Sequence, residues 1–293
     1  SLAATTDAPA PALYPVARPR GAELCTPMRR TLATLALLAA LALIAPGAVP
    51  QVYAASTCPE HFAAGAEPAL VNPRLGASTR ELCFRAFAVL HSGATRTPLW
   101  SAEHLTAERV DEARAVQRTN LFHPESRLPV DERSELADYA RSGYDRGHMS
   151  PSGDMPDADS QAESFSLANM VPQAHRLNTG LWSSIEGKVR ALALRDGELF
   201  VVTGPVFQGA DLQALRGRVL VPTAVFKAVY NPRRGTAGAY LSPNSDGAGW
   251  EAVSIAQLRT LTGLDVFPAL PEETKAASPQ LPAPRTRRPR RVP

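Results

Sequence analysis

Two short stretches of this sequence most constrain what the chain can fold into. The first, Tyr144 to Met155, reads YDRGHMSPSGDM, and the second, Ala168 to Arg190, reads ANMVPQAHRLNTGLWSSIEGKVR. We expect a strand around His148, a second strand over residues 166–171, and a helix that begins at or near Asn178. This order predicts a ββα unit, which we expect to be inserted in a mixed sheet.

Helical spacing is expected to gather polar groups in the second stretch. Asn178, Trp182, Glu186 and Arg190 are each four residues apart, so neighbours in the series should lie on one side of an α-helix. Amide and carboxylate oxygens suit Mg²⁺, which keeps several waters and takes one or two protein ligands. A guanidinium can hold a phosphate through two parallel hydrogen bonds. An ordinary amphipathic helix with a core tryptophan is the alternative.

His148 could supply the base that phosphodiester hydrolysis needs besides a hard cation and phosphate donors. An imidazole with its ordinary pKa of about 6.5 accepts a proton at neutral pH. Gly147 removes a side chain beside it and lets a backbone or a substrate approach closely. Taken alone, a histidine after a glycine is usually a loop or strand residue. Together, these features indicate a metal-dependent nuclease site.

The segment resembles the DNA/RNA non-specific endonuclease family. The family's Asp-Arg-Gly-His tetrad stands at residues 145–148, and its further motifs follow in order at Thr97–Trp100, Asn169–Gln173 and Val202–Pro205. The resemblance covers roughly residues 84–267. It implies an α+β fold, with a mixed or antiparallel sheet core, helices and a ββα-metal catalytic unit. It also implies hydrolysis of DNA and RNA by a metal-activated water, leaving 5′ phosphates.

The resemblance assigns roles residue by residue. His148 would be the general base, and Asn178 the direct protein ligand of a hydrated Mg²⁺, for which Mn²⁺ could substitute. Glu186 would hold metal-bound waters, and Asn169 would support the site.

Arginines complete the implied site. Arg190 would contact the phosphate or the leaving group, and Arg118 would lie near the scissile phosphate. Arg114 is an alternative to Arg118 because the surrounding motif is loose. Arg146 and Asp145 would either act directly or position the loop.

The beginning of the chain predicts export. Arg29 and Arg30 precede a Leu/Ala-rich run from Leu32 to Ala45, and small residues follow near Ala54. This pattern predicts a signal peptide over residues 28–54, cleaved after Ala54 or after the next residue. Residues 1–27 would be upstream or non-native sequence, with a genuine cytoplasmic extension as the alternative. A membrane anchor is disfavoured because a span needs about 20 apolar residues. We therefore expect a secreted or periplasmic protein without stable membrane association.

Export also bears on the cysteines. The mature chain would keep Cys58 and Cys83, and a pair in an oxidising compartment predicts one disulfide. Closing a loop of about 25 residues would stabilise the fold by about 3 kcal/mol. The spacing does not suit zinc. Two unpaired buried thiols are the alternative.

The end of the chain predicts a basic tail. Residues 271–293 are rich in proline and arginine and are expected to be disordered. The net charge of the whole chain is +3, but residues 55–270, the expected nuclease domain, are slightly acidic. Positive potential should therefore concentrate at the site arginines. The tail would add salt-sensitive attraction to phosphates, with an inert tail as the alternative.

Residues 55–270 are long enough for one domain with a substantial core. Strands are expected over residues 84–91, 98–105, 199–203, 219–221 and 224–230, and helices over 106–118, 157–166, 179–194 and 254–261. No G-x-S-x-G elbow, P-loop, dinucleotide fingerprint or H-E-x-x-H motif occurs.

Two other functions fit the same residues. One is a nucleic-acid-binding or DNA-uptake protein without turnover, which the intact His148, Asn178 and Glu186 argue against. The other is an antibacterial nuclease toxin restrained by an inhibitor protein, which the lack of a long delivery domain argues against. Contacts to the phosphate backbone carry no base information, so DNA and RNA both remain expected substrates.

Overall fold

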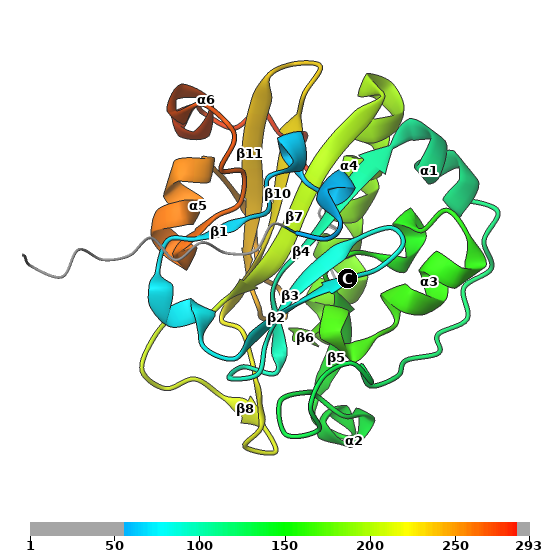
Figure 1. The fold of residues 1–293 in the computed structure, drawn as a ribbon, viewed down its shortest axis with the longest axis vertical. Coiled ribbons are helices and arrows are strands. Elements are labelled where there is room, and N and C mark those ends of the chain that lie inside the picture. The colour runs from blue at the N-terminus through cyan, green and yellow to red at the C-terminus, as the bar shows by residue number, and fades with distance from the viewer. Residues whose placement is uncertain (1–55, 286–293) are drawn as a thin grey trace, which may run out of the picture. The chain divides into compact units, whose positions relative to one another are not determined.

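The computed structural model describes residues 56–285 (Figure 1). The expected upstream extension, signal peptide and cleavage site lie outside the described residues, as do residues 286–293 of the expected tail. No helix within the described range is long and apolar enough to cross a membrane.

A seven-stranded sheet in which every neighbouring pair is antiparallel forms the centre of the described domain. Its order is β12-β11-β10-β7-β4-β3-β2 (Figure 1). The strands are β2 (Thr79–Cys83), β3 (Ala88–Ser92), β4 (Thr97–Thr106), β7 (Glu198–Val206), β10 (Ala224–Asn231), β11 (Thr236–Pro243) and β12 (Glu251–Val253). β-Branched and aromatic residues favour strands, and β10 reads AVFKAVYN.

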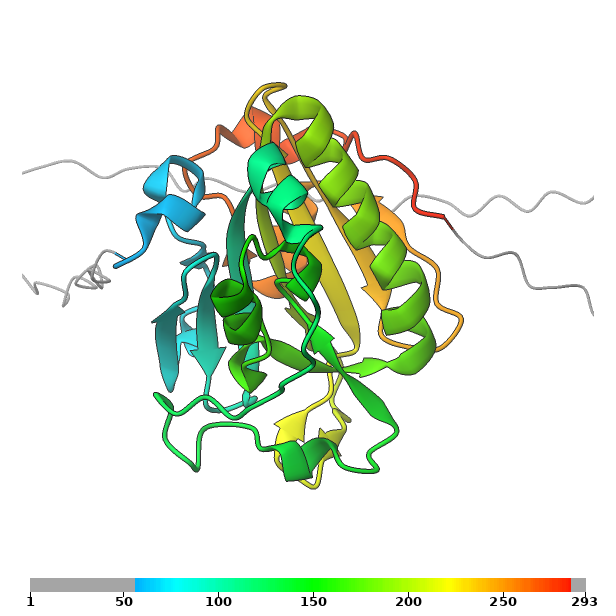
Figure 2. The same cartoon turned by 90° about the vertical axis from the view of Figure 1, so that its right-hand side faces the viewer.

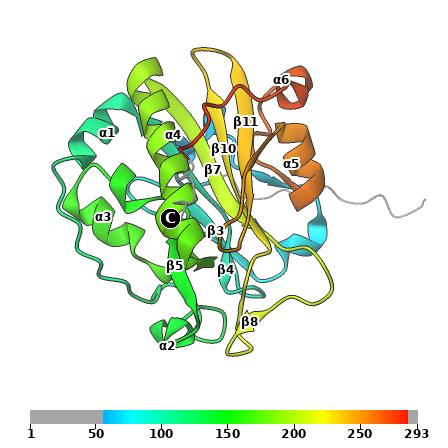
Figure 3. The ribbon, with the colours of Figure 1, turned by 180° about the vertical axis from the view of Figure 1, so that it is seen from behind.

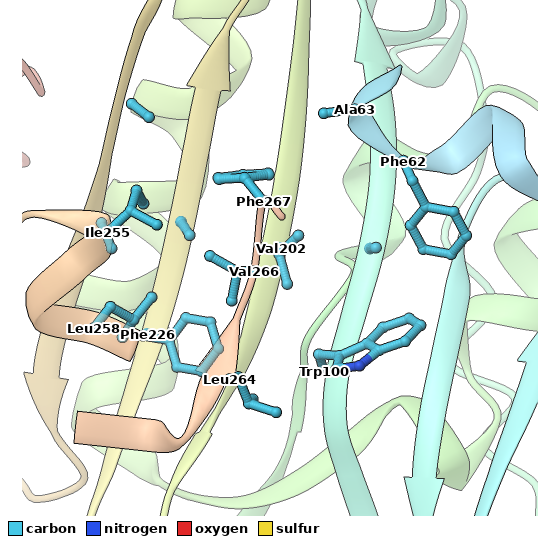
Figure 4. Close-up of a cluster of buried hydrophobic side chains, with 14 of the residues drawn as sticks. Phe62, Ala63, Trp100, Val202, Phe226, Ile255, Leu258, Leu264, Val266 and Phe267 are labelled. Carbon is cyan, nitrogen blue, oxygen red and sulfur yellow. The ribbon is translucent and has the colours of Figure 1, made fainter. Parts of the chain in front are cut away.

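Alternating side chains give each face of the sheet its own core. Phe226 of β10 and Val202 of β7 pack in one cluster with residues of α5 (Ile255–Thr262), as Figure 4 shows. Their chain neighbours Val225 and Val201 belong to a cluster on the other face, which α4 (Ser183–Asp196) covers (Figure 3).

The ββα unit lies beside this sheet. Strands β5 (Tyr144–His148) and β6 (Met170–Ala174) form a separate two-stranded antiparallel ribbon, with His148 opposite Met170. A π-helical turn, Leu177–Trp182, then leads into α4, and β5 lies beneath the first residues of α4 in Figure 3. The predicted α+β class is confirmed. The predicted insertion of the unit in a mixed sheet is wrong, since within residues 56–285 the strands β5 and β6 pair only with each other.

The remaining elements are short. They are α1 (Ala107–Ala113), α2 (Leu136–Tyr139), α3 (Ala158–Ser164), α6 (Glu272–Ala276), and the strand pairs β1 (Ala69–Leu70) with β13 (Leu264–Asp265) and β8 (Ala214–Leu215) with β9 (Val219–Leu220). Short 3₁₀ helices span Pro59–His61, Ala63–Gly65, Pro73–Gly76, Ser152–Asp154 and Leu167–Asn169.

Several predicted boundaries were wrong for local reasons. The strand expected over 84–91 begins at Ala88, because Phe84 and Phe87 stack with ring centroids 4.4 Å apart in the turn between β2 and β3. The strand expected over 166–171 begins at Met170, after a 3₁₀ turn that the Ser166 side chain caps. The sequence analysis did not predict β2, β11 or β12.

The C-terminal segment corrects the predicted tail. Residues 271–285 are packed on the domain rather than separate from it. Lys275 is buried and its Nζ lies 2.7 Å from a carboxylate oxygen of Asp265. Further on, the hydroxyl of Tyr240 donates to the carbonyl of Pro282 over 2.8 Å. These polar contacts, together with Leu281, which packs against the core, hold the segment on the domain.

Cys58 and Cys83 form the predicted disulfide, with their Cα atoms 6.0 Å apart. It joins the segment before the first 3₁₀ helix to the last residue of β2. Within the described range, Glu81 and these two cysteines are the one His/Cys/Asp/Glu group compact enough to suggest a metal site. Because the disulfide uses both sulfurs, this group offers no thiolate.

Candidate active site

A cavity of about 780 Å³ opens where the β5–β6 ribbon meets the start of α4. Six of the seven predicted site residues line it, namely Arg118, Arg146, His148, Asn178, Glu186 and Arg190. Arg141 lines it as well, so four arginines face two acids, Asp145 and Glu186. The excess of positive charge suits an anionic ligand.

His148 ends β5 and is 8% exposed. Its ring meets Phe165 edge to face at 5.0 Å and lies 5.6 Å from Phe122. Its Nε2 is buried without a hydrogen-bond partner in residues 56–285, which leaves Nδ1 as the nitrogen available to the cavity. Burial first, and then the charges of Arg118 and Arg146, lower the pKa of His148 to about 3. The imidazole is therefore neutral at pH 7.

Gly147 permits close packing within the ribbon. A Cβ at this position would lie 2.2 Å from Oε1 of Gln173 and 2.6 Å from its Cβ. The close approach predicted beside His148 is thus made by a protein side chain from β6.

Asn178 is oriented by Asp145. The amide Nδ2 of Asn178 donates to Oδ2 of Asp145 over 2.9 Å, and His175 Nδ1 lies 3.0 Å from the same oxygen. A carboxylate only accepts hydrogen bonds, so the nitrogen must face Asp145 and the amide oxygen Oδ1 is left free of it. The structure thus gives Asp145 a positioning contact between the two halves of the motif.

The predicted helical series needs a correction. Asn178 and Trp182 lie in the π-helical turn, and Trp182 is fully buried in the core instead of lining the cavity. Bonding from i to i+5 makes this turn wider than an α-helical turn, so a spacing of four no longer keeps one face. Ser183, five residues after Asn178, lines the cavity with Glu186.

Glu186 is half-buried and makes no hydrogen bond with another described residue. Burial raises its pKa to about 7, although the charges of Lys227 and Arg190 oppose this shift. Arg190 Nη1 donates to the buried Oδ1 of Asp154 over 2.6 Å. The guanidinium is therefore held in place one turn beyond Glu186.

Two buried ionisable side chains behind the cavity were not predicted from the sequence. Lys227 of β10 is 1% exposed, and its Nζ donates to Thr203 Oγ1 over 2.6 Å and to the carbonyl of Met149 over 3.2 Å. Glu103 of β4 is also buried, and burial raises its pKa well above the ordinary range. The available signal was a single charge inside each apolar strand, because such charges are rarely buried without a partner. Lys227 holds the backbone next to His148.

Asn169 lies behind the cavity and does not line it. It is fully buried; its Oδ1 accepts from the Ser150 amide at 2.9 Å and the Ser101 hydroxyl at 3.1 Å. Its Nδ2 donates to the carbonyls of Ser150 and Ser164. This geometry fits the predicted role of Asn169, support of the site, through the loop after His148.

The other arginines are also held by neighbours. Arg118 Nη1 donates to Ser152 Oγ over 2.9 Å, and the Arg146 guanidinium lies 4.2 Å from the ring centroid of Phe122. Arg114 instead pairs with Asp111 and does not line the cavity.

The low pKa of His148 predicts a pH-dependent stability. The unfolded histidine, with a pKa near 6.5, binds more protons than the folded one, so stability is lost as pH falls below about 6.5. The slope for one such group is at most about 1.4 kcal/mol per pH unit. We expect His148→Asn to flatten the pH dependence of the unfolding free energy between pH 6.5 and 4. Urea titrations of both proteins at several pH values measure the unfolding free energy. Equal slopes of this free energy against pH would contradict the prediction.

The ribbon, the following helix and a cavity with a neutral imidazole, an oriented amide and a carboxylate define a ββα-metal nuclease. The family model for DNA/RNA non-specific endonucleases matches residues 68–273. The chain belongs to this family, which is metal-dependent.

Relatives agree with this assignment. Nuclease C1 of Cunninghamella echinulata is 33% identical over 174 residues, covering 54% of this chain and 69% of the relative. The mitochondrial nuclease EXOG of Danio rerio is 31% identical over 224 residues, covering 69% and 64%. The chain thus spans about two thirds of these curated relatives. A solved structure titled as an EndoG/EndoGI complex matches with a TM-score of 0.62 and 27% identity, covering 66% of this chain and 88% of that one.

Proposed function

We propose that this protein is a secreted, sugar-non-specific endonuclease that hydrolyses phosphodiester bonds in DNA and RNA. One observation carries the proposal: a cavity rich in arginine holds the neutral His148, the amide oxygen of Asn178 and the carboxylate of Glu186. Membership of a family of non-specific nucleases supports the same activity.

The residues fit a hard divalent cation, Mg²⁺, with Mn²⁺ as a substitute. Because Asp145 occupies the amide nitrogen of Asn178, the oxygen of that amide is available as a direct ligand. The Glu186 carboxylate would accept hydrogen bonds from metal-bound waters. When bound, the ion would neutralise charge on the phosphate oxygens and on the departing 3′ oxygen.

His148 would take the proton of the attacking water. A general base works best with a pKa near the working pH, whereas the pKa of His148 in the free protein is about 3. A phosphate held between Arg118 and Arg146 would offset the two cations that help depress this pKa. Substrate binding would therefore raise the pKa of His148 at the moment when the base is needed.

The arginines would position the phosphate. Arg118 is held by Ser152, Arg146 lies over Phe122, and Arg190 is paired with buried Asp154. Side chains that are already ordered lose little freedom when they bind, and fixed donors stabilise developing charge without rearrangement.

Export is part of the proposal. The order of basic, apolar and small residues over 28–54 supports a signal peptide, and the Cys58–Cys83 disulfide suits an oxidising compartment. An inhibitor protein is proposed as a partner because the similar EndoG structure is titled as an inhibited complex.

Metal removal tests the activity. With the chain from Ala55 onward, we expect supercoiled plasmid and total RNA to be degraded in Mg²⁺ and to survive in EDTA, with recovery on adding excess Mg²⁺. Gel electrophoresis and release of acid-soluble nucleotides measure both reactions. Binding of either substrate without cleavage in Mg²⁺ or Mn²⁺ would overturn the proposed endonuclease activity and favour a nucleic-acid-binding protein.

A further inference from the structure

A second cavity, of about 430 Å³, adjoins the candidate active site. Ala140, Arg141 and Tyr144 line both cavities, so the two lie next to each other and share this wall. The other side of the second cavity includes Gln213, just before β8, and Arg216, in the turn of the β8–β9 hairpin. Figure 2 shows this hairpin in yellow beside α2 at the lower end of the domain.

Contacts between distant segments fix the walls of the second cavity. The hydroxyl of Tyr144 donates to Oε1 of Gln213 over 3.1 Å. Arg216 Nε donates over 2.7 Å to the carbonyl of Ala137, and its Nη2 over 3.3 Å to that of Ala140. These bonds join the hairpin to α2 and to the start of β5. The cavity is therefore built by tertiary contacts rather than by one loop.

Arg141 stands on the ridge between the cavities in an unusual conformation. The Ser142 amide donates to the carbonyl of Tyr139 over 3.2 Å, and Arg141 has a φ of 56°. With Ala140 at φ −62° and ψ 118°, this is a type II turn, whose third residue favours glycine or asparagine. The exposed Arg141 guanidinium makes no hydrogen bond or ion pair with residues 56–285. The turn thus presents an exposed, unpaired guanidinium beside both cavities, where it can meet an external anion.

We propose that the second cavity binds nucleotides next to the scissile bond, with Arg141 on a backbone phosphate and Tyr144 beneath a base. The proposal rests on the proposed nuclease function and adds a substrate contact to it. Arg141 carries the charge that a phosphate needs, and Tyr144 supplies an aromatic ring, with its hydroxyl fixed, at the junction of both cavities. Phosphate contact with base stacking is a sequence-independent way to hold a strand.

Substrate length tests this site. We expect Arg141→Gly to raise the KM for a 12-nucleotide single strand about fivefold more than the KM for a dinucleotide, which is too short to occupy both cavities. Losing one phosphate contact should also reduce the slope of log KM against log salt by roughly 0.7. Glycine suits the turn, so the melting temperature should not fall.

Arg96→Gly is the matched control, because Arg96 also has a positive φ, of 55°, and lines neither cavity. It removes the same charge and should leave both KM values unchanged. Tyr144→Phe should keep the length preference, whereas Tyr144→Leu should weaken it.

The outcomes separate this inference from the nuclease proposal. If the wild-type protein cleaves neither substrate in Mg²⁺, the nuclease function fails. If it cleaves both while Arg141→Gly keeps the wild-type length preference and salt slope, the second binding site is refuted. Equal effects of Arg141→Gly and Arg96→Gly would also refute it, since they would reflect general charge alone.

Discussion

His148→Ala is expected to lower the rate of plasmid cleavage by about 10²–10⁴-fold, the usual contribution of a general base. His148 is the single histidine among the described residues that line the cavity, and its neutral imidazole can accept a proton. Single-turnover cleavage at saturating Mg²⁺ measures the rate, because it follows chemistry rather than product release.

The fold should tolerate this change. His148 Nε2 has no hydrogen-bond partner in the described part of the chain, so alanine leaves no donor or acceptor newly unpaired there. The melting temperature and the near-ultraviolet circular dichroism should therefore remain close to those of the wild type. His123→Ala is the matched control, because His123 is exposed and does not line the cavity. A folded His148→Ala protein that cuts plasmid at the wild-type rate would contradict the assignment of His148 as the general base.

Removing the disulfide should have the largest effect on stability. We expect the Cys58→Ser, Cys83→Ser double variant to lose about 3 kcal/mol of unfolding free energy, since the bond closes a loop of sequence separation 25. The loss of stability should be localised at one edge of the sheet, because Cys83 ends the edge strand β2. Activity at 25 °C should persist, since neither cysteine lines the cavity.

Urea unfolding of the oxidised wild type, the reduced wild type and the double variant measures this contribution. The last two should share a midpoint below that of the oxidised protein. A titration of free thiols should find none in the oxidised, cleaved chain that begins at Ala55. Identical midpoints for all three forms would show that the bond adds no stability.

The local parts of the fold were predictable because their signals are local. A β-rich run such as Ala224–Asn231 specifies a strand through its own side chains, and α5 begins at the capping residue Ser254. Element ends were less predictable, since they depend on contacts such as the stacking of Phe84 on Phe87. The C-terminal segment shows the same dependence, because the carbonyl of Pro282 accepts a hydrogen bond from Tyr240, which is 42 residues away.

By itself, the sequence predicted the chemistry that we propose for this protein. His148 and Asn178 stand in a compact motif with Glu186, and the resemblance to the family predicted their roles as base, amide ligand and carboxylate. The pairing of Cys58 with Cys83 also followed from the sequence, because the expected mature chain has only these two cysteines.

The tertiary structure alone decided how these groups are aimed. It turned Trp182 into the core through a π-helical turn, and it fixed the amide of Asn178 by Asp145, 33 residues away. It also placed the charge of Lys227 behind the loop after His148, 78 residues from its acceptor Met149. Such contacts join residues far apart in the chain, whereas periodicity describes only neighbours along one helix or strand. The orientation of each proposed metal ligand and the extent of the proposed substrate site therefore depend on tertiary packing.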